Sequence, residues 1–311
     1  MSVFVCTRER LVRLRRDGRS WSADALLEGA GAQCVAVDAA RVIVGTRGRG
    51  VLVSADAGER WDEVALPERD VFSVAISAAD GALYAGTEPS RLFVSGTGEG
   101  WAELEALQDI PSRDRWSFPP RPWTHHVRWI APDPHRAERL LVGIELGGVM
   151  LSEDGGRTFS DHRPGAKLDA HMLAWHPDAD GRAYQAAGDG AAWSRDGGRT
   201  WEAADEGRDL RYCWAVAVDP ADPARWYVSA ASGPWTAHSA RNARGRLYRR
   251  DAAWEALALP SESMPYALAA LDGELFAGMA DGTILRSADR GESWDDLGTG
   301  VGSVTAMAAG A

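Results

Sequence analysis

Cysteine is scarce in this sequence: three cysteines occur among 311 residues, at positions 6, 34 and 213. They lie far apart, form no CxxC pair and are odd in number, which argues against a disulfide framework. We expect Cys6, Cys34 and Cys213 to be buried, reduced thiols that pack as small apolar side chains.

Long apolar runs are also missing. No stretch approaches the roughly 18 consecutive apolar residues that a membrane-spanning helix needs. The apolar residues 1–6 are too few for the hydrophobic part of a signal peptide, and Arg8, Arg10 and Arg13 follow them directly. These absences predict a cytoplasmic protein that does not have a membrane as its partner.

An excess of positive charge is absent too. Lys and Arg number 34 against 45 Asp and Glu, which gives a formal net charge of −11. Nucleic acids and anionic membranes both favour a basic protein face, so neither is an expected partner. The motifs of several enzyme classes are missing as well, since no Walker loop, HExxH or GxSxG segment occurs.

One short motif recurs with the spacing Ser-x-Asp-x-Gly-x-x-Trp/Phe. Each copy lies between two short apolar runs, which predicts a hairpin connection. The Asp carboxylate can accept hydrogen bonds from the amides of the turn, the Gly supplies a positive φ, and the aromatic residue opens the next strand. Clean copies begin at Ser54, Ser152, Ser194 and Ser287, and degenerate copies end at Trp21, Trp101 and Trp254.

The spacing of the aromatic residues predicts the fold. They fall at positions 21, 61, 101, 159, 201, 254 and 294, and four of the six intervals are 40 to 42 residues long. That is the length of a four-stranded propeller blade. Helical periodicity is absent. We therefore predict an all-β, seven-bladed β-propeller of four-stranded antiparallel blades, with residues 1–311 as a single domain.

The two ends of the sequence predict how the ring closes. Residues 3–7 match the second strand of a blade, and residues 303–308 match the first. The C-terminal strand should therefore complete blade 1, which removes free sheet edges and locks the ring.

The repeated turns resemble the Asp box, also called the bacterial neuraminidase repeat. This repeat occurs in sialidases, xyloglucan-cleaving hydrolases, sortilin-type receptors and the assembly factors of photosystem II, and the resemblance covers nearly the whole chain. Seven blades favour the seven-bladed relatives over the six-bladed sialidases. The sialidase arginine triad cannot be assigned here, and an Arg-Ile-Pro start does not occur. The resemblance implies a propeller that is either glycoside hydrolase-like or a scaffold.

Two repeats are longer than the others, and both extra segments should lie on the face opposite the Asp boxes. Residues 108–125 precede the first strand of blade 4, and residues 232–245 join the second and third strands of blade 6. Enlarged loops on one face of a rigid scaffold usually carry function. The aromatic and imidazole side chains that could line a pocket there, or cap the core instead, are Trp116, Trp123, His125, Trp214, Trp235 and His238.

Two histidines are the first candidates for chemistry. Superposition of the first strands places His126, His171 and Trp214 at equivalent positions in blades 4, 5 and 6. Two histidines at one height would converge near the mouth of the central channel, where they could transfer protons or bind a metal ion. The alternative is a pair of structural histidines with satisfied hydrogen bonds.

Acids and arginines form a second group of candidates at the exits of the second strands. The acids Glu88, Glu145 and Asp189 belong to blades 3 to 5, and crowding at a channel mouth would raise their pKa values or let them bind a cation. Arg8 and Arg47, across the ring, could bind an anionic part of a ligand. The remaining ligand-binding candidates are Arg128, which should pair with one of these acids, and Arg211, Tyr212 and Tyr266.

Two functions follow from these candidates. The first is a site for a small polar ligand at the channel mouth, under the loops of blades 3 to 6; the resemblance implies a carbohydrate as one such ligand. The site would bind the ligand or act on it as a hydrolase or lyase, with Glu145, Asp189 or Glu88 as acid or base. His126 and His171 would assist or would bind a divalent metal; no cofactor is certain. The alternative is a non-catalytic platform for a protein partner.

Overall fold

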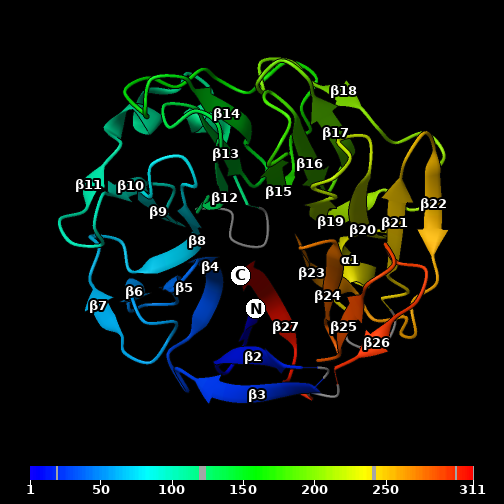
Figure 1. Cartoon of the computed structure of the whole chain (residues 1–311). Helices are drawn as coiled ribbons and strands as arrows, with labels where there is room; N and C mark the ends of the chain where they lie inside the picture. The colour runs from blue at the N-terminus through cyan, green and yellow to red at the C-terminus, as the bar shows by residue number, and fades with distance from the viewer. Residues whose placement is uncertain (19, 119–123, 240–242, 298–299, 311) are drawn as a thin grey trace.

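The computed structural model describes residues 1–18, 20–118, 124–239, 243–297 and 300–310. Within these ranges the chain forms seven antiparallel sheets that stand as blades around a central axis (Figure 1). The predicted all-β, seven-bladed propeller is confirmed. In the same ranges helical structure is limited to the 3-10 helices η1 (Glu105–Asp109) and η2 (Arg113–Arg115) and the helix α1 (Pro234–Ala237). None of these helices has the length and apolar character to span a membrane.

Within each blade the strands are ordered from the central axis to the rim. The innermost strands are β4 (Ala32–Asp38), β8 (Asp70–Ile76), β12 (Val127–Pro132), β15 (Ala170–Trp175), β19 (Tyr212–Val218), β23 (Pro265–Leu271) and β27 (Val304–Gly310). The second strands are β5 (Arg41–Thr46), β9 (Leu83–Glu88), β13 (Leu140–Ile144), β16 (Ala183–Ala187), β20 (Trp226–Ala231), β24 (Glu274–Met279) and β1 (Ser2–Thr7).

In five blades the outermost strand is shorter than the other three strands. The third strands are β6 (Val51–Ser54), β10 (Leu92–Ser95), β14 (Gly148–Ser152), β17 (Gly190–Ser194), β21 (Arg246–Arg250), β25 (Ile284–Ser287) and β2 (Leu11–Asp17). The outermost strands are β7 (Asp62–Val64), β11 (Ala102–Glu103), β18 (Glu202–Ala203), β22 (Trp254–Leu257), β26 (Asp295–Asp296) and β3 (Ser20–Leu26).

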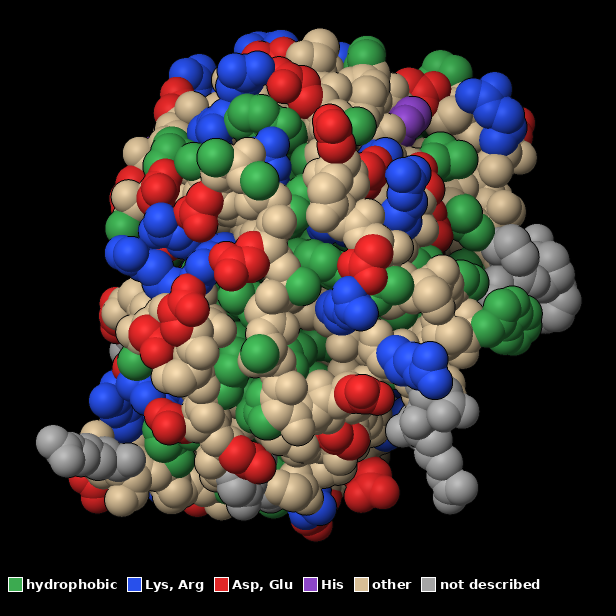
Figure 2. Space-filling model, turned by 90° about the vertical axis from the view of Figure 1, so that its right-hand side faces the viewer, with side chains coloured by type: hydrophobic (Ala, Val, Ile, Leu, Met, Phe, Trp, Pro, Cys, Tyr) green, Lys and Arg blue, Asp and Glu red, His purple; other side chains and the backbone are tan. Residues whose placement is uncertain are grey.

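Burial explains the composition of the strands. The second strands are covered on both faces by neighbouring blades, and all five residues of β13 and of β16 are buried. A strand buried on both faces is a continuous apolar run and does not alternate. Both residues of β18 are exposed at the rim. There acidic and basic side chains are interspersed (Figure 2), and pairs such as Arg199–Glu153 link adjacent blades.

The ring closes as the sequence predicts. The C-terminal strand β27 pairs antiparallel with β1, with Val3 opposite Ala309 and Val5 opposite Met307. The sheet of blade 1 therefore has the order β27-β1-β2-β3. Figure 1 shows both chain ends near the centre of the ring. The strand that closes the ring therefore comes from the opposite end of the chain, and β1 is paired on both sides, with β27 and with β2.

Blade 4 departs from the expected four strands. Its described residues form three strands, β12-β13-β14, and the fourth is reduced to a single bridge between Leu151 and Ser160. A side chain takes over part of the missing ladder, because His162 Nδ1 accepts a hydrogen bond from the Val149 amide at 3.1 Å. The Arg163 amide donates to the Val149 carbonyl at 2.9 Å. The backbone of β14 is thus satisfied without a regular partner strand.

The four clean motif turns share one hydrogen-bond pattern. In the copy that begins at Ser194, the Ser hydroxyl donates to Asp196 Oδ1 at 2.8 Å and accepts from the Gly198 amide at 3.0 Å. The same carboxylate oxygen accepts from the Thr200 amide at 2.9 Å. Beyond this shared pattern, the indole of Trp201 donates to the Gly198 carbonyl at 3.1 Å, as that of Trp61 does to Gly58 at 3.0 Å. The motif therefore folds its own turn, as expected from its residue types.

The three cysteines are buried, and none is in a disulfide within the described chain.

Every inner strand carries one extra residue near its start. The pairing of each inner strand with the second strand of its blade shifts there by one position, as in a β-bulge. We call the seven residues at these shifts the bulge ring: Gln33, Phe72, Arg128, His171, Trp214, Tyr266 and Thr305. Bulges re-aim side chains, and six of the seven face the cavity at the channel mouth as well as the channel below it.

In blade 3, the residue of β9 that pairs beside the bulge of β8 has to be small. A Cβ atom on Gly86 would lie 2.5 Å from Ser73 Oγ of its own blade and 2.5 Å from Val127 Cγ1 of the next blade. Carbon atoms in contact normally stay about 3.5–4.0 Å apart. Glycine at position 86 is therefore a packing requirement that lets two blades approach each other beside the bulge.

We expect Gly86→Ala to lower the free energy of unfolding by about 1–3 kcal/mol, because the added methyl group overpacks the contact between blades 3 and 4. Gly96→Ala is the matched control, since a Cβ atom there meets nothing within 4 Å. Urea denaturation of both variants measures the difference. Equal stability of the two variants would contradict this account of the close approach.

Candidate functional site

The two insertions meet the bulge ring at one end of the channel. Helices η1 and η2 lie in the first insertion, before β12, and α1 lies in the second, between β20 and β21. Residues 119–123 and 240–242 lie outside the described residues, so the expectation for Trp123 falls there. The loops that follow β1 and β5 reach the same end, where Arg8, Arg47, Phe118 and His238 line one cavity.

This cavity has a volume of about 530 Å³. A second cavity of about 410 Å³ continues down the channel between the inner strands. The residues that line both, and so mark the boundary between them, are Gln33, Phe72, Arg128, Trp214, Tyr266 and Thr305. The cavities are therefore an upper and a lower part of the channel, joined at the level of the bulge ring.

A cluster of acids and histidines lies beside this boundary. Glu145 follows β13 and receives His126 on one side, with His126 Nε2 2.8 Å from Glu145 Oε2. On its other side Glu145 Oε1 lies 3.8 Å from His171 Nε2. Asp169 precedes β15, and its Oδ1 lies 3.6 Å from the same nitrogen. The side chains of both histidines are almost completely buried.

The neighbouring blade fixes the tautomer of His171. Its Nδ1 lies 2.6 Å from the carbonyl oxygen of Cys213, which can only accept a hydrogen bond. Nδ1 must therefore carry the proton. In the neutral ring Nε2 then presents a lone pair to Glu145 and Asp169, and it has no hydrogen-bond partner among the described residues. Three atoms that all carry lone pairs converge at this point.

Arg128 supplies the positive charge of the cluster. Its Nε lies 3.3 Å from Glu145 Oε2, as expected from the sequence, and its guanidinium lies 4.8 Å from the ring of Trp214. Oxygen Oε2 of Glu145 is thus shared by Arg128 and His126, while Oε1 points toward His171. This division of contacts sets the orientation of the carboxylate.

The protonation states of Glu145 and His126 are coupled. Burial alone would raise the pKa of Glu145, but the hydrogen bond with His126 and the charges of His171 and Arg128 lower this pKa to about 2. Burial would lower the pKa of His126, but its contacts with Glu145 and Glu88 raise this pKa above the ordinary value. Glu145 therefore stays ionised, which suits an anchor or a ligand more than a proton donor.

The pKa values of Asp169 and His171 shift in the opposite directions to those of Glu145 and His126. Burial and the charges of Glu145 and Asp189 raise the pKa of Asp169 to about 7, against smaller opposing effects of Arg128 and the Leu146 amide. Burial also lowers the pKa of His171 to about 4. The sequence predicts a raised pKa for Glu145, and this prediction is wrong because its pKa is lowered; the acid of this cluster with a raised pKa is Asp169, which is not among the predicted acids. A carboxyl group with a pKa near neutrality suits proton transfer.

The structure corrects the equivalence proposed for the histidines. The shifted position of β12 holds Arg128, and that of β15 holds His171, so His126 lies two residues above the position of His171. The counterpart of His126 in blade 5 is Asp169. His126 and His171 do approach the same carboxylate, but from different levels of the channel. The sequence missed Asp169 because the extra residue of each bulge is not visible in the repeat pattern.

The three predicted acids lie in different settings. Glu145 belongs to the cluster, and Glu88 Oε2 lies 3.5 Å from His126 Nδ1. The carboxylate of Asp189 instead accepts hydrogen bonds from the amides of Leu168 and Asp169, both at 3.2 Å. Asp189 therefore holds the loop that carries Asp169.

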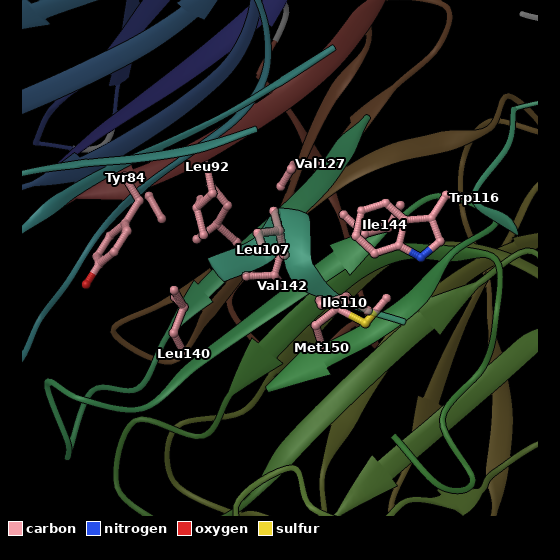
Figure 3. Close-up of a cluster of buried hydrophobic side chains, with 12 residues drawn as sticks. Tyr84, Leu92, Leu107, Ile110, Trp116, Val127, Leu140, Val142, Ile144 and Met150 are labelled. Carbon is pink, nitrogen blue, oxygen red and sulfur yellow. The ribbon is translucent and has the colours of Figure 1, made fainter. Parts of the chain in front are cut away.

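Not all of the predicted ligand-binding residues line the cavity at the channel mouth. Trp116 is 6% exposed and packs with Ile110, Ile144 and Met150 (Figure 3), and its indole donates to Ser112 Oγ at 3.2 Å. Its ring therefore covers the core of blade 4. His125 packs edge-on against it. Arg211 is exposed and does not line either channel cavity.

A chain of hydrogen bonds links the candidates of blades 6 and 7. Tyr266 Oη donates to the Ala237 carbonyl at 2.8 Å, so it accepts from His238 Nδ1 at 2.9 Å. His238 Nε2 is then free to accept from Tyr212 Oη at 3.4 Å. Trp214 lies among these rings, 5.4 Å from Tyr266 and 4.9 Å from His238. This sector gives the cavity one aromatic wall.

Comparisons with known proteins agree on the fold. No protein-family model and no curated protein matches the sequence. A GH74 xyloglucanase from Xanthomonas campestris superposes with a TM-score of 0.71 at 19% identity, covering 93% of this chain and 50% of the enzyme. YCF48 bound to a D1 peptide gives 0.64 at 16%, covering 90% and 86%. The WD40 β-propeller domain of Doa1 gives 0.68 at 14%, covering 94% and 91%.

These identities show a shared fold, and the chain spans half of the length of the xyloglucanase. The resemblance to xyloglucan-cleaving hydrolases and to photosystem II assembly factors is confirmed at that level.

The raised pKa of Asp169 predicts a pH dependence of stability. The folded state holds this proton between pH of about 4 and about 7 while the unfolded state does not, so stability falls as pH rises through that window. In chelator-treated buffer, Asp169→Asn should therefore be more stable than the parent at pH 7.5, by on the order of 2 kcal/mol, and similar to it at pH 4. Chemical denaturation across this range tests it, with the exposed Asp62→Asn as control. If the free energy of unfolding depends on pH in the same way for the parent and for Asp169→Asn, the raised pKa of Asp169 is contradicted.

Proposed function

We propose that the chain binds a small polar ligand with an anionic group, of the size of a sugar acid, in the cavity at the channel mouth. The observation that carries this proposal is the contrast between the two sides of the cavity. One side presents exposed arginines, and the other presents the aromatic wall and the ionised Glu145.

The arginine side is formed by Arg8 and Arg47 of blades 1 and 2. Both side chains are exposed at the cavity. Arg47 donates to the neutral amide oxygen of Gln33 at 3.1 Å, and neither arginine forms an ion pair with a described residue. Their charges are therefore available to a carboxylate or phosphate, which a guanidinium binds in a bidentate manner.

The opposite side is suited to a hydroxylated ring. Trp214 and Tyr266 present aromatic surface, and Glu145 supplies a carboxylate that can accept hydrogen bonds from hydroxyl groups. A pocket of mostly apolar walls with few convergent polar groups is the usual form of a small-molecule site.

The volume also favours a small molecule. A cavity of about 530 Å³ lies within the range of small-ligand pockets, roughly 300–1,000 Å³. Among propellers of this fold, one is a xyloglucanase and another is bound to a peptide, so both sugars and peptides are precedents for ligands. The cavity volume supports the smaller of these two, a sugar.

Removal of the two arginines tests the proposal. We expect Arg8→Ala/Arg47→Ala to bind glucuronate at least about tenfold more weakly than the parent, because charged hydrogen bonds contribute about 1.5–3 kcal/mol. Arg49→Ala is the matched control, since Arg49 lies on the same loop but pairs with Glu63. Isothermal titration with glucuronate, and with glucose as the neutral comparison, measures the effect. Equal affinity of the double variant and the control would refute the anion site.

A second candidate function, binding of a protein segment, is favoured by Trp235. This side chain is 91% exposed at the start of α1, and the other large apolar side chain exposed in the described ranges is Leu168 at 48%. An exposed tryptophan is a typical anchor of a protein interface.

A photo-crosslinking amino acid at position 235 should then form a discrete adduct in cells, while the same group at Arg195, in a motif turn at the opposite end of the ring, should not. Separation of the products by mass identifies the adduct. Identical patterns from both positions would exclude Trp235 as an anchor.

A further inference from the structure

We infer that Glu145, Asp169 and His171 form a binding site for a divalent transition-metal ion such as zinc. This ion site goes beyond the ligand site proposed above and does not depend on the arginines that would hold the anion.

The geometry brings three donor atoms together. Glu145 Oε1 comes from the end of β13 in blade 4, and Asp169 Oδ1 and His171 Nε2 come from the start of β15 in blade 5; one donor atom of each residue lies within 4.8 Å of the other two. The nitrogen is 3.6 Å from Asp169 and 3.8 Å from Glu145. Two ligands bound at about 2.1 Å in a tetrahedral site lie roughly 3.4 Å apart, so small side-chain rotations would bring the three atoms into place.

His171 gives an independent reason to place a cation here. Its side chain is fully buried, and Nδ1 is committed to the carbonyl of Cys213. Its Nε2 points between two carboxylates without a hydrogen-bond partner in the described chain. A buried lone pair that faces two carboxyl groups is unfavourable unless a positive charge, either a proton or a metal ion, lies between them. A bound metal ion supplies that charge.

The surrounding residues have the form of an outer shell. A metal-binding histidine usually donates its second ring nitrogen to a carbonyl, as His171 does to Cys213. A metal-binding carboxylate is usually hydrogen-bonded in turn, as Glu145 is through its Oε2 to His126. Because these contacts occupy Nδ1 and Oε2, the atoms that remain are the ones that face the proposed ion.

The donor set indicates which ion binds. One imidazole with two carboxylates suits zinc, manganese or iron(II), whereas calcium and magnesium prefer oxygen ligands alone. Three protein ligands leave a coordination position open. Glu145 lines the channel-mouth cavity, so a molecule bound in that cavity could occupy this position.

Metal titration tests the site. Chelator-treated protein should bind one equivalent of zinc in isothermal titration, and cobalt(II) should give visible absorption bands typical of nitrogen and oxygen ligands. Asp169→Asn and His171→Gln should each weaken zinc binding at least about tenfold. The matched control is Glu88→Gln, which alters a carboxylate beside His126 that is not one of the three ligands.

Asp169→Asn alone decides the test if His171→Gln fails to fold, because Asp169 is partly exposed and the substitution keeps its shape. Absence of zinc binding by the parent, or unchanged binding by Asp169→Asn, overturns the proposal. Zinc binding that persists in Arg8→Ala/Arg47→Ala supports an ion site distinct from the anion site, so the two proposals can fail separately.

Discussion

The structure depends on how seven inner strands are joined around one axis. Each inner strand bulges near its start, and the ladder of its own blade is interrupted there. In blades 3, 4 and 6 the carbonyl group just before the bulge accepts a hydrogen bond from a side chain of the preceding blade. Gln33 donates to Val71, Ser73 donates to Val127, and His171 donates to Cys213. The same irregularity therefore links neighbouring blades and turns one side chain of each blade toward the channel.

The chemistry of the cluster follows from this arrangement. The carbonyl of Cys213 fixes the tautomer of His171, and through it the direction of the lone pair toward Glu145 and Asp169. On the other side of Glu145, His126 and Arg128 hold the second carboxylate oxygen. The two carboxyl groups consequently differ, because Glu145 has positive partners whereas Asp169 faces mainly negative ones.

The sequence predicts the fold well and the site only in part. The motif turns fold through their own Ser, Asp and Gly, so their spacing predicts the number and length of the blades. The terminal segments predict how the ring closes. Blade 4 differs because His162 replaces part of its fourth strand. The bulges depend on contacts between blades and leave no mark in the repeat, which is why His126 was matched with His171 and Asp169 was missed. Trp116 was a pocket candidate, but its burial depends on how η1 and η2 fold over β13 and β14.

The bulge ring also removes the rotational symmetry of the channel lining. Seven blades of nearly the same shape have approximate rotational symmetry, and a channel lined by identical groups would accept a ligand in seven equivalent orientations. The bulge residues abolish that degeneracy, because one arc holds Phe72, Arg128, His171, Trp214 and Tyr266 of blades 3 to 7, while Gln33 and Thr305 of blades 2 and 1 form the other. A ligand that enters along the axis meets a cationic and aromatic arc opposite a neutral polar one. Such a ligand therefore has one preferred orientation about the axis, even though the scaffold around it is repetitive.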